Sequence, residues 1–167
     1  MDRADITAEL VAKLVADQFP GWAGLPVVPV ELNGWDNTTF RLGDELSVRL
    51  PSADVYVAEI DKEHRWLPVL APQLSLPIPT PVARAEPSVA FPRPWSVYGW
   101  IDGWPATPDR VGDPVAFATD LAGFLASLYQ ADTTDGPGAG PHSFSRGCAV
   151  SVWDDQVRET ISVLGGC

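Results

Sequence analysis

The fold is decided by the stretch Asn33-Gly34-Trp35-Asp36-Asn37-Thr38-Thr39-Phe40-Arg41-Leu42, which is followed by Leu46-Ser47-Val48-Arg49-Leu50. A β-branched run, Val27 to Leu32, comes before its polar turn, and Gly43-Asp44-Glu45 makes a hairpin turn within it. Pro51 closes the last segment, because proline cannot continue a central ladder. The pattern predicts three consecutive antiparallel strands, the third of which carries a cation.

This layout is that of a cradle for the phosphates of a nucleotide. A phosphate needs backbone N–H groups that converge in a tight turn, and a cation to neutralise it. Gly34 would give the turn its freedom, and side-chain donors follow at Asn37, Thr38 and Thr39. Arg49 would supply the cation, although a lone arginine on a strand is often only part of a solvated face.

Neither of the two common phosphate-binding fingerprints occurs in the chain. There is no GxxxxGK[ST] stretch, which excludes an ordinary P-loop, and no GxGxxG turn between a strand and a helix, which excludes a dinucleotide-binding fingerprint. A helix after the third strand could supply a carboxylate to hold the cation, and Glu59, Asp61 and Glu63 all qualify by residue type. A solvated helix charge is the alternative for each of them.

The remaining N-terminal elements follow from periodicity. Asp5 to Phe19 predicts a helix that Asp2 or Asp5 could cap. Ala53 to Leu67 predicts a second helix, with Asp61 and Arg65 as an i,i+4 pair and Pro68 as its end or kink. The last two predicted elements are an extended edge segment and a further strand, Leu76 to Ala83 and Trp95 to Ile101.

After a turn-rich boundary near Gly103 to Asp109 the chain becomes helical. Asp113-Pro114 is a good helix start, and an apolar face follows at Phe117, Leu121, Phe124, Leu125 and Leu128. Ser151 could cap a last helix. These features predict two domains, residues 1–103 and 104–167.

Composition limits the partners. The 167 residues carry a net charge of −11, which argues against a nucleic-acid backbone or an anionic membrane and is compatible with a cationic substrate. Cys148 and Cys167 lack a CxxC spacing and are expected to be free thiols. We find no signal peptide and no apolar run near the roughly 18 residues that span a bilayer, so the expected compartment is the cytoplasm.

Several stretches together resemble the aminoglycoside phosphotransferase family, which has a protein-kinase-like fold. They occur in family order and correspond to the nucleotide loop with its hairpin, the third strand, the αC-type helix, the interlobe hinge and the first long helix of the C-lobe. In this sequence they are residues 33–44, Val48-Arg49-Leu50-Pro51, residues 62–68, residues 94–103 and residues 121–129. The resemblance implies an α+β fold: an N-lobe sheet of about five antiparallel strands with an N-terminal helix and an αC-type helix, followed by the first helices of a truncated C-lobe.

The resemblance also implies roles for individual residues. Arg49 takes the place of the kinase lysine on strand 3, and Glu63 that of the helix carboxylate that pairs with it. Asn37, Thr38 and Thr39 would cover the phosphates, Ser47 would form the upper wall, and Gly99 and Ile101 would offer hinge backbone groups to adenine. The implied cofactor is ATP or GTP with Mg²⁺, and the implied substrate of the complete enzyme is a small hydroxyl compound such as an aminoglycoside antibiotic.

The sequence departs from the family pattern in two ways. Its strand cation is arginine, whose longer planar fork is not equivalent to a lysine ammonium. The family's catalytic loop, a His-Gly-Asp pattern followed by Asn, and its metal-binding Asp do not occur in the chain, so we assign no catalytic or metal residue. His64 and His142 are expected to be surface histidines. The chain is therefore expected to be a truncated, inactive kinase that self-associates through the apolar face that begins at Phe117.

Two other interpretations of the chain's function are compatible with the sequence. A non-catalytic nucleotide-binding or protein-interaction module would retain Arg49 and Glu63 without doing chemistry. A structural α+β domain with no ligand would require the family resemblance to be accidental.

Overall fold

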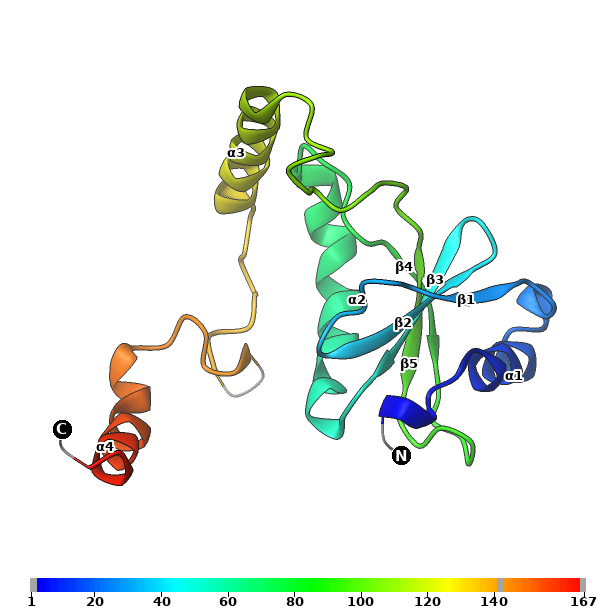
Figure 1. Ribbon diagram of the computed structural model, residues 1–167, viewed down its shortest axis with the longest axis horizontal. Coiled ribbons are helices and arrows are strands. Elements are labelled where there is room, and N and C mark those ends of the chain that lie inside the picture. Colours follow the sequence, from blue (N-terminus) through cyan, green and yellow to red (C-terminus); the bar gives the residue numbers. More distant parts are fainter. Residues whose placement is uncertain (1–2, 141–142, 166–167) are drawn as a thin grey trace. The chain divides into compact units, whose positions relative to one another are not determined.

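In this computed structural model, which describes residues 3–140 and 143–165, five strands form one antiparallel sheet in the order β1-β2-β3-β5-β4 (Figure 1). The strands are β1 (Val27–Pro29), β2 (Asn37–Leu42), β3 (Leu46–Pro51), β4 (Pro81–Ala85) and β5 (Trp95–Gly99). Thr39 pairs with Arg49, and Arg49 pairs with Ser96, so β3 lies at the centre of the sheet. The α+β sheet expected from the sequence is confirmed.

Four α-helices of the described residues lie before, between and after the strands along the chain. They are α1 (Ala8–Gln18), α2 (Ala58–Leu70), α3 (Pro114–Gln130) and α4 (Asp154–Val163), with short 3₁₀ turns at η1 (Arg3–Asp5), η2 (Pro20–Trp22), η3 (Asp54–Tyr56), η4 (Ala71–Gln73) and η6 (Val150–Trp153). The turn between β2 and β3 needs Gly43, whose φ of +60° lies in the left-handed region. None of the helices that the structure describes combines the length and apolar character needed to cross a bilayer.

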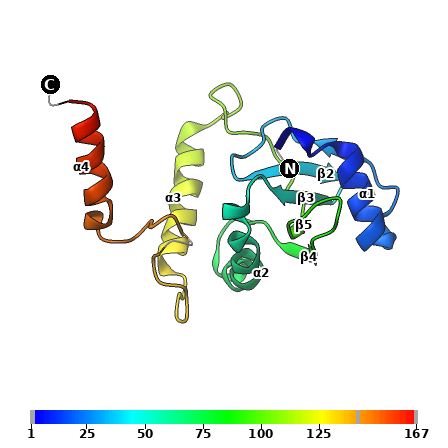
Figure 2. The ribbon, with the colours of Figure 1, turned by 90° about the horizontal axis from the view of Figure 1, so that it is seen from below.

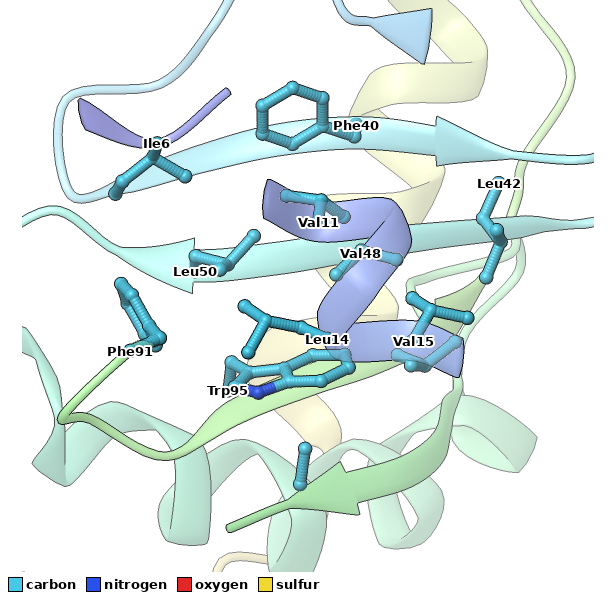
Figure 3. Close-up of a cluster of buried hydrophobic side chains, with 12 residues drawn as sticks. Ile6, Val11, Leu14, Val15, Phe40, Leu42, Val48, Leu50, Phe91 and Trp95 are labelled. Atoms are coloured by element: carbon cyan, nitrogen blue, oxygen red, sulfur yellow. The ribbon is translucent and has the colours of Figure 1, made fainter. Parts of the chain in front are cut away.

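The main hydrophobic core lies between α1 and one face of the sheet (Figure 3). Val11, Leu14 and Val15 of α1 are at most 1% exposed and pack with Trp95 of β5 and with the apolar residues of β2 and β3. Every second residue of β2 is buried, which is the period expected of a strand with one face on a core. The opposite face of the sheet is thereby left for polar side chains.

Three details of the first helices differ from the sequence-based expectation. Thr7, and not Asp5, caps α1 by accepting a hydrogen bond from the Leu10 amide at 3.3 Å, whereas Asp2 lies outside the described residues. Residues 54–56 form a separate 3₁₀ turn before α2. Pro68 does not end α2, which continues to Leu70 with the proline inside its last turn.

The chain divides into two compact units, Met1–Asp132 and Thr133–Cys167. The first unit includes α3, whose start is confirmed: the Asp113 carboxylate accepts hydrogen bonds from the Val115 and Ala116 amides at 2.9 and 3.0 Å. The predicted division into lobes at residue 103 rests on composition and stays a prediction. Self-association also stays a prediction. The α3 face that would mediate it is exposed, with Phe117, Leu121, Leu125 and Leu128 each 41–44% accessible.

The second unit contains η6 and α4. Ser151 lies inside η6 and does not cap α4; that position belongs to Trp153, which makes no side-chain cap, so the predicted cap is wrong. Arg158 donates to Asp154 at 2.6 Å on the surface of α4. Cys148 is a free thiol, whereas His142 and Cys167 lie outside the described residues.

We expect Leu14→Ala to lower the free energy of unfolding by about 2–5 kcal/mol, because it opens a cavity at the centre of the α1 core. Urea denaturation followed by far-UV circular dichroism measures the change. Leu128→Ala removes the same atoms from an exposed site on α3 and is expected to cost less than about 1 kcal/mol. Equal losses in the two variants would contradict the placement of the core.

Candidate nucleotide-binding site

A cavity of about 520 Å³ opens on the polar face of the sheet, within the size range of small-molecule sites. Its walls come from the loop before β2, from β2 and β3, from α2, and from the segments around Pro79 and after β5. The lining residues are Val30, Leu32, Gly34, Trp35, Asp36, Asn37, Thr39, Ser47, Arg49, Glu63, Pro79, Gly99, Trp100 and Ile101.

The cavity brings together all but one of the residues that the sequence assigned to a nucleotide site. Asn37, Thr39, Ser47, Arg49, Glu63, Gly99 and Ile101 line it. Thr38 does not, because alternation along β2 turns its side chain to the core side, where it is 6% exposed. Any contact of Thr38 with a ligand in this cavity would therefore have to come from its backbone.

Arg49 and Glu63 form the charged pair of the site. The Arg49 Nη1 and Glu63 Oε2 atoms are 3.9 Å apart, and both side chains are 29% exposed. At this distance the pair is an ion pair without a close hydrogen bond. The Arg49 guanidinium also lies 4.7 Å from the centre of the Tyr98 ring, in cation–π geometry.

Sequence reasoning missed Tyr98. Its hydroxyl donates to Glu63 Oε2 at 2.5 Å, so Tyr98 and Arg49 share one carboxylate oxygen. Burial, then this hydrogen bond and the negative charge of Glu63, raises the pKa of Tyr98, which keeps the hydroxyl protonated as a donor. Strand alternation could have predicted it, because Tyr98 comes two residues after Ser96 and therefore lies on the same side of β5, the side that faces α2.

The expectation that His64 is a surface histidine is wrong, because its side chain is partly buried and bonded to β5. Its Nε2 atom lies 2.9 Å from the Ser96 hydroxyl oxygen, which joins α2 to β5. Burial and the nearby positive charge of Arg84 lower the pKa of His64, against the opposing effect of Asp61 and Glu63. Asp61 itself pairs with Arg84 on β4 at 2.9 Å and not with Arg65, so the predicted i,i+4 pair is wrong.

The loop before β2 is held by its own side chains. Asn33 Oδ1 accepts a hydrogen bond from the Thr39 amide at 2.6 Å, which closes the loop at its base. Gly34 does not supply the freedom predicted for it: its φ is not in the left-handed region, and an added Cβ would meet no atom within 4 Å. The turn is therefore built by hydrogen bonds and does not depend on glycine conformation.

The first amides at the end of β5 and just after it already donate hydrogen bonds to protein carbonyls. The Gly99 amide donates to the Thr80 carbonyl and the Trp100 amide to the Glu45 carbonyl, both at 2.8 Å. Within the described residues the Ile101 amide donates to no protein acceptor, so it is the first backbone donor of this segment that a ligand could use. Gly99 can offer a ligand only its carbonyl.

The same residues do not form a metal centre. No group of three or more His, Cys, Asp or Glu side chains within residues 3–140 and 143–165 is arranged to hold a metal ion. Mg²⁺ prefers carboxylate oxygens and phosphate oxygens in near-octahedral geometry. We therefore assign no described residue to the Mg²⁺ that the fold family implies, and no step to the ion.

The chain belongs to the phosphotransferase enzyme family, whose model matches residues 28–161. This match confirms the family that the sequence resembles, and the solved structures below confirm the kinase-like fold. Among curated proteins, no sequence matches the chain.

Solved structures show the same fold. The GDP complex of wild-type aminoglycoside 2'-phosphotransferase-IIIa is 20% identical with a TM-score of 0.70, and the match covers 94% of this chain and 52% of that one. The GDP and kanamycin complex of APH(2")-IIia is 18% identical with a TM-score of 0.64, over 92% of this chain and 56% of that one. The streptomycin-ATP-APH(2")-IIa ternary complex is 20% identical with a TM-score of 0.54, over 76% and 41%. The chain thus spans about half the length of these relatives.

The lowered pKa of His64 gives stability a defined pH dependence. Its pKa lies below the ordinary 6.5 in the folded chain, so protonation favours the unfolded state. Stability from neutral His64 is complete above pH 6.5 and falls as the pH drops below it. We expect His64→Gln, which can still bond Ser96, to lose less stability than wild type between pH 7.5 and 5.5, measured by urea denaturation. Parallel pH profiles would contradict this placement of His64.

Proposed function

We propose that this chain forms the nucleotide-binding part of a phosphotransferase that moves a phosphoryl group from ATP or GTP to a hydroxyl group of a small molecule. The observation that carries the proposal is the convergence of Arg49, Glu63 and the loop residues Asn37 and Thr39 on one cavity. Family membership and the nucleotides named in the related complexes, GDP and ATP, support it.

Different residues of the chain would bind different parts of the nucleotide. Arg49 would neutralise phosphate charge, because a guanidinium offers two parallel N–H groups to phosphate oxygens. Glu63 and Tyr98 would hold Arg49 at the inner wall of the cavity, and Ile101 would donate its amide to the base. The sheet and α2 would thus fix the phosphates and the base at opposite ends of one cavity.

The hydroxyl compound that would accept the phosphoryl group is proposed from the relatives and from the charge of the chain. Kanamycin and streptomycin are named in complexes of related proteins, and both the family and the net charge of −11 support a cationic hydroxyl compound of the aminoglycoside class. An enzyme of this kind that inactivates such a compound would confer antibiotic resistance, and its place of action would be the cytoplasm, where ATP and GTP are found.

A second candidate function rests on a different observation. The residues assigned to the cavity all bind or position a nucleotide and none is assigned a transfer step, which is also the pattern of a module that binds nucleotide without transferring phosphate. Incubation of the chain with ATP and an aminoglycoside, followed by mass spectrometry of the acceptor, separates the two candidates. A phosphorylated acceptor supports the enzyme, and bound but unconsumed ATP supports the module.

We expect Arg49→Ala to weaken ATP and GTP binding by about tenfold or more, because a charge-assisted contact contributes roughly 1.5–3 kcal/mol. Isothermal titration calorimetry of the chain with each nucleotide, with and without Mg²⁺, measures the dissociation constants. Circular dichroism checks that the variant folds, since a half-buried strand arginine is expected to contribute little to stability.

Arg65→Ala is the matched control for this experiment. It removes the same charge from the exposed side of α2, where Arg65 stacks on Trp66 and does not line the cavity. Its affinity for nucleotide should equal that of wild type. Wild-type affinity in Arg49→Ala would make Arg49 structural, and no binding to wild type at millimolar nucleotide would remove the proposed function from this chain.

A further inference from the structure

Arg3, which lies in η1 before the first helix, makes three hydrogen bonds to the loop that borders the cavity. Its Nη2 atom donates to the Gly34 carbonyl at 2.6 Å and to the Asn37 carbonyl at 3.4 Å, and its Nη1 atom donates to the Trp35 carbonyl at 3.3 Å. These contacts join residues more than thirty positions apart in the sequence. Figure 2 shows the N-terminal end of the chain and the loop that precedes β2.

Ser52, at the end of β3, completes this set of contacts. Its hydroxyl donates to the Trp35 and Asp36 carbonyls, both at 3.0 Å, and its amide donates to the Asp36 carbonyl at 2.9 Å. Together Arg3 and Ser52 therefore engage the carbonyl oxygens of four consecutive loop residues, Gly34 to Asn37. A loop whose carbonyls are all bound to protein donors has its backbone acceptors neutralised.

Amides of the same loop, unlike its carbonyls, lack a hydrogen-bond partner in the described part of the protein. Within the described part of the chain, the Gly34, Trp35 and Asp36 amides donate to no protein acceptor, and all three residues line the cavity. Successive backbone N–H groups in a turn can form the concave anion sites known as nests. Binding the carbonyls elsewhere is what gives such a loop a net preference for an anion, because free carbonyls would repel it.

Arg3 is itself fixed in place by the hydrophobic core. The Arg3 carbonyl accepts a hydrogen bond from the Ile6 amide at 3.2 Å, and the Ile6 side chain is 5% exposed within the cluster that packs α1 on the sheet. Figure 3 shows Ile6 as a member of this cluster. The guanidinium therefore extends from an anchored segment and not from a free chain end.

We infer that Arg3 is a positioning residue for the phosphates of the nucleotide, acting through the loop of residues 34–37 and not by contact with the ligand. By holding three of the loop carbonyls, it presents the loop amides to the phosphate chain. This inference rests on the proposed function for its ligand, and it predicts that Arg3 matters for nucleoside diphosphates and triphosphates and not for the nucleoside alone.

The test compares ADP with adenosine by titration calorimetry on the full chain and on Arg3→Ala, Arg3→Lys and Lys13→Ala. Lys13 is an exposed cation on α1 of the same N-terminal segment, so its variant controls for loss of charge. We expect Arg3→Ala to weaken ADP binding by roughly three- to tenfold with less than a twofold change for adenosine, and Lys13→Ala to change neither. Arg3→Lys keeps the charge but loses the two-nitrogen fork, so it should lie between Arg3→Ala and wild type.

Amide hydrogen exchange, followed by NMR without ligand, tests the loop contact independently of binding. The Ser52 and Thr39 amides report on the loop, since they donate to the Asp36 carbonyl and to the Asn33 side chain. Both should exchange several-fold faster in Arg3→Ala, whereas the Trp100 amide, bonded to the Glu45 carbonyl, should not change. An increase at all three amides would mean general destabilisation and would overturn a specific role for the loop.

Other outcomes also decide the matter. Unchanged exchange at Ser52 and Thr39 would overturn the inference, as would equal losses of ADP and adenosine affinity, or wild-type ADP affinity in Arg3→Lys, which would reduce Arg3 to its charge. If wild type binds no ADP, the proposed function fails for this chain and the phosphate role of Arg3 falls with it. The exchange data would then show separately whether Arg3 orders the loop.

Discussion

The two-residue period of β2, β3 and β5 is the constraint on which the rest of this structure depends. It gives the sheet one apolar face, where α1 packs on Phe40, Val48 and Trp95, and one polar face, where Arg49 and Tyr98 meet Glu63 of α2. A slip of one residue in the pairing of β2 with β3 would bury Arg49 and expose Val48. The large cost of burying that charge unpaired fixes the register, and the register in turn fixes the site.

The polar face is organised around a single carboxylate. Glu63 accepts the Tyr98 hydroxyl at 2.5 Å and faces Arg49 at 3.9 Å, so the shorter bond belongs to the neutral donor. Arg49 is thus held partly by charge and partly by its stacking on the Tyr98 ring. A cation that does not make a close hydrogen bond to its counter-ion keeps N–H groups for an incoming anion, which suits the phosphate binding proposed for this cavity.

Local sequence patterns predicted much of this arrangement. The hairpin at Gly43, the helix start at Asp113 and the apolar stripe of α1 each depend on residues close together in the chain, so their spacing carried the information. The long-range partners did not follow from spacing. Asp61 could have paired with Arg65 by helical geometry, but the packing of α2 against β4 brought Arg84 closer. The burial of His64 against Ser96 has the same origin.

By itself, the sequence determined the order of the elements, the two-faced character of the strands and the identity of seven of the fourteen residues that line the cavity. Only the tertiary structure decided that Tyr98 binds Glu63 and that Arg3 reaches the loop at Gly34. The physical reason is that periodicity reports which side of an element a residue occupies. It does not report which distant group will lie opposite, because that depends on how helices and sheet pack together.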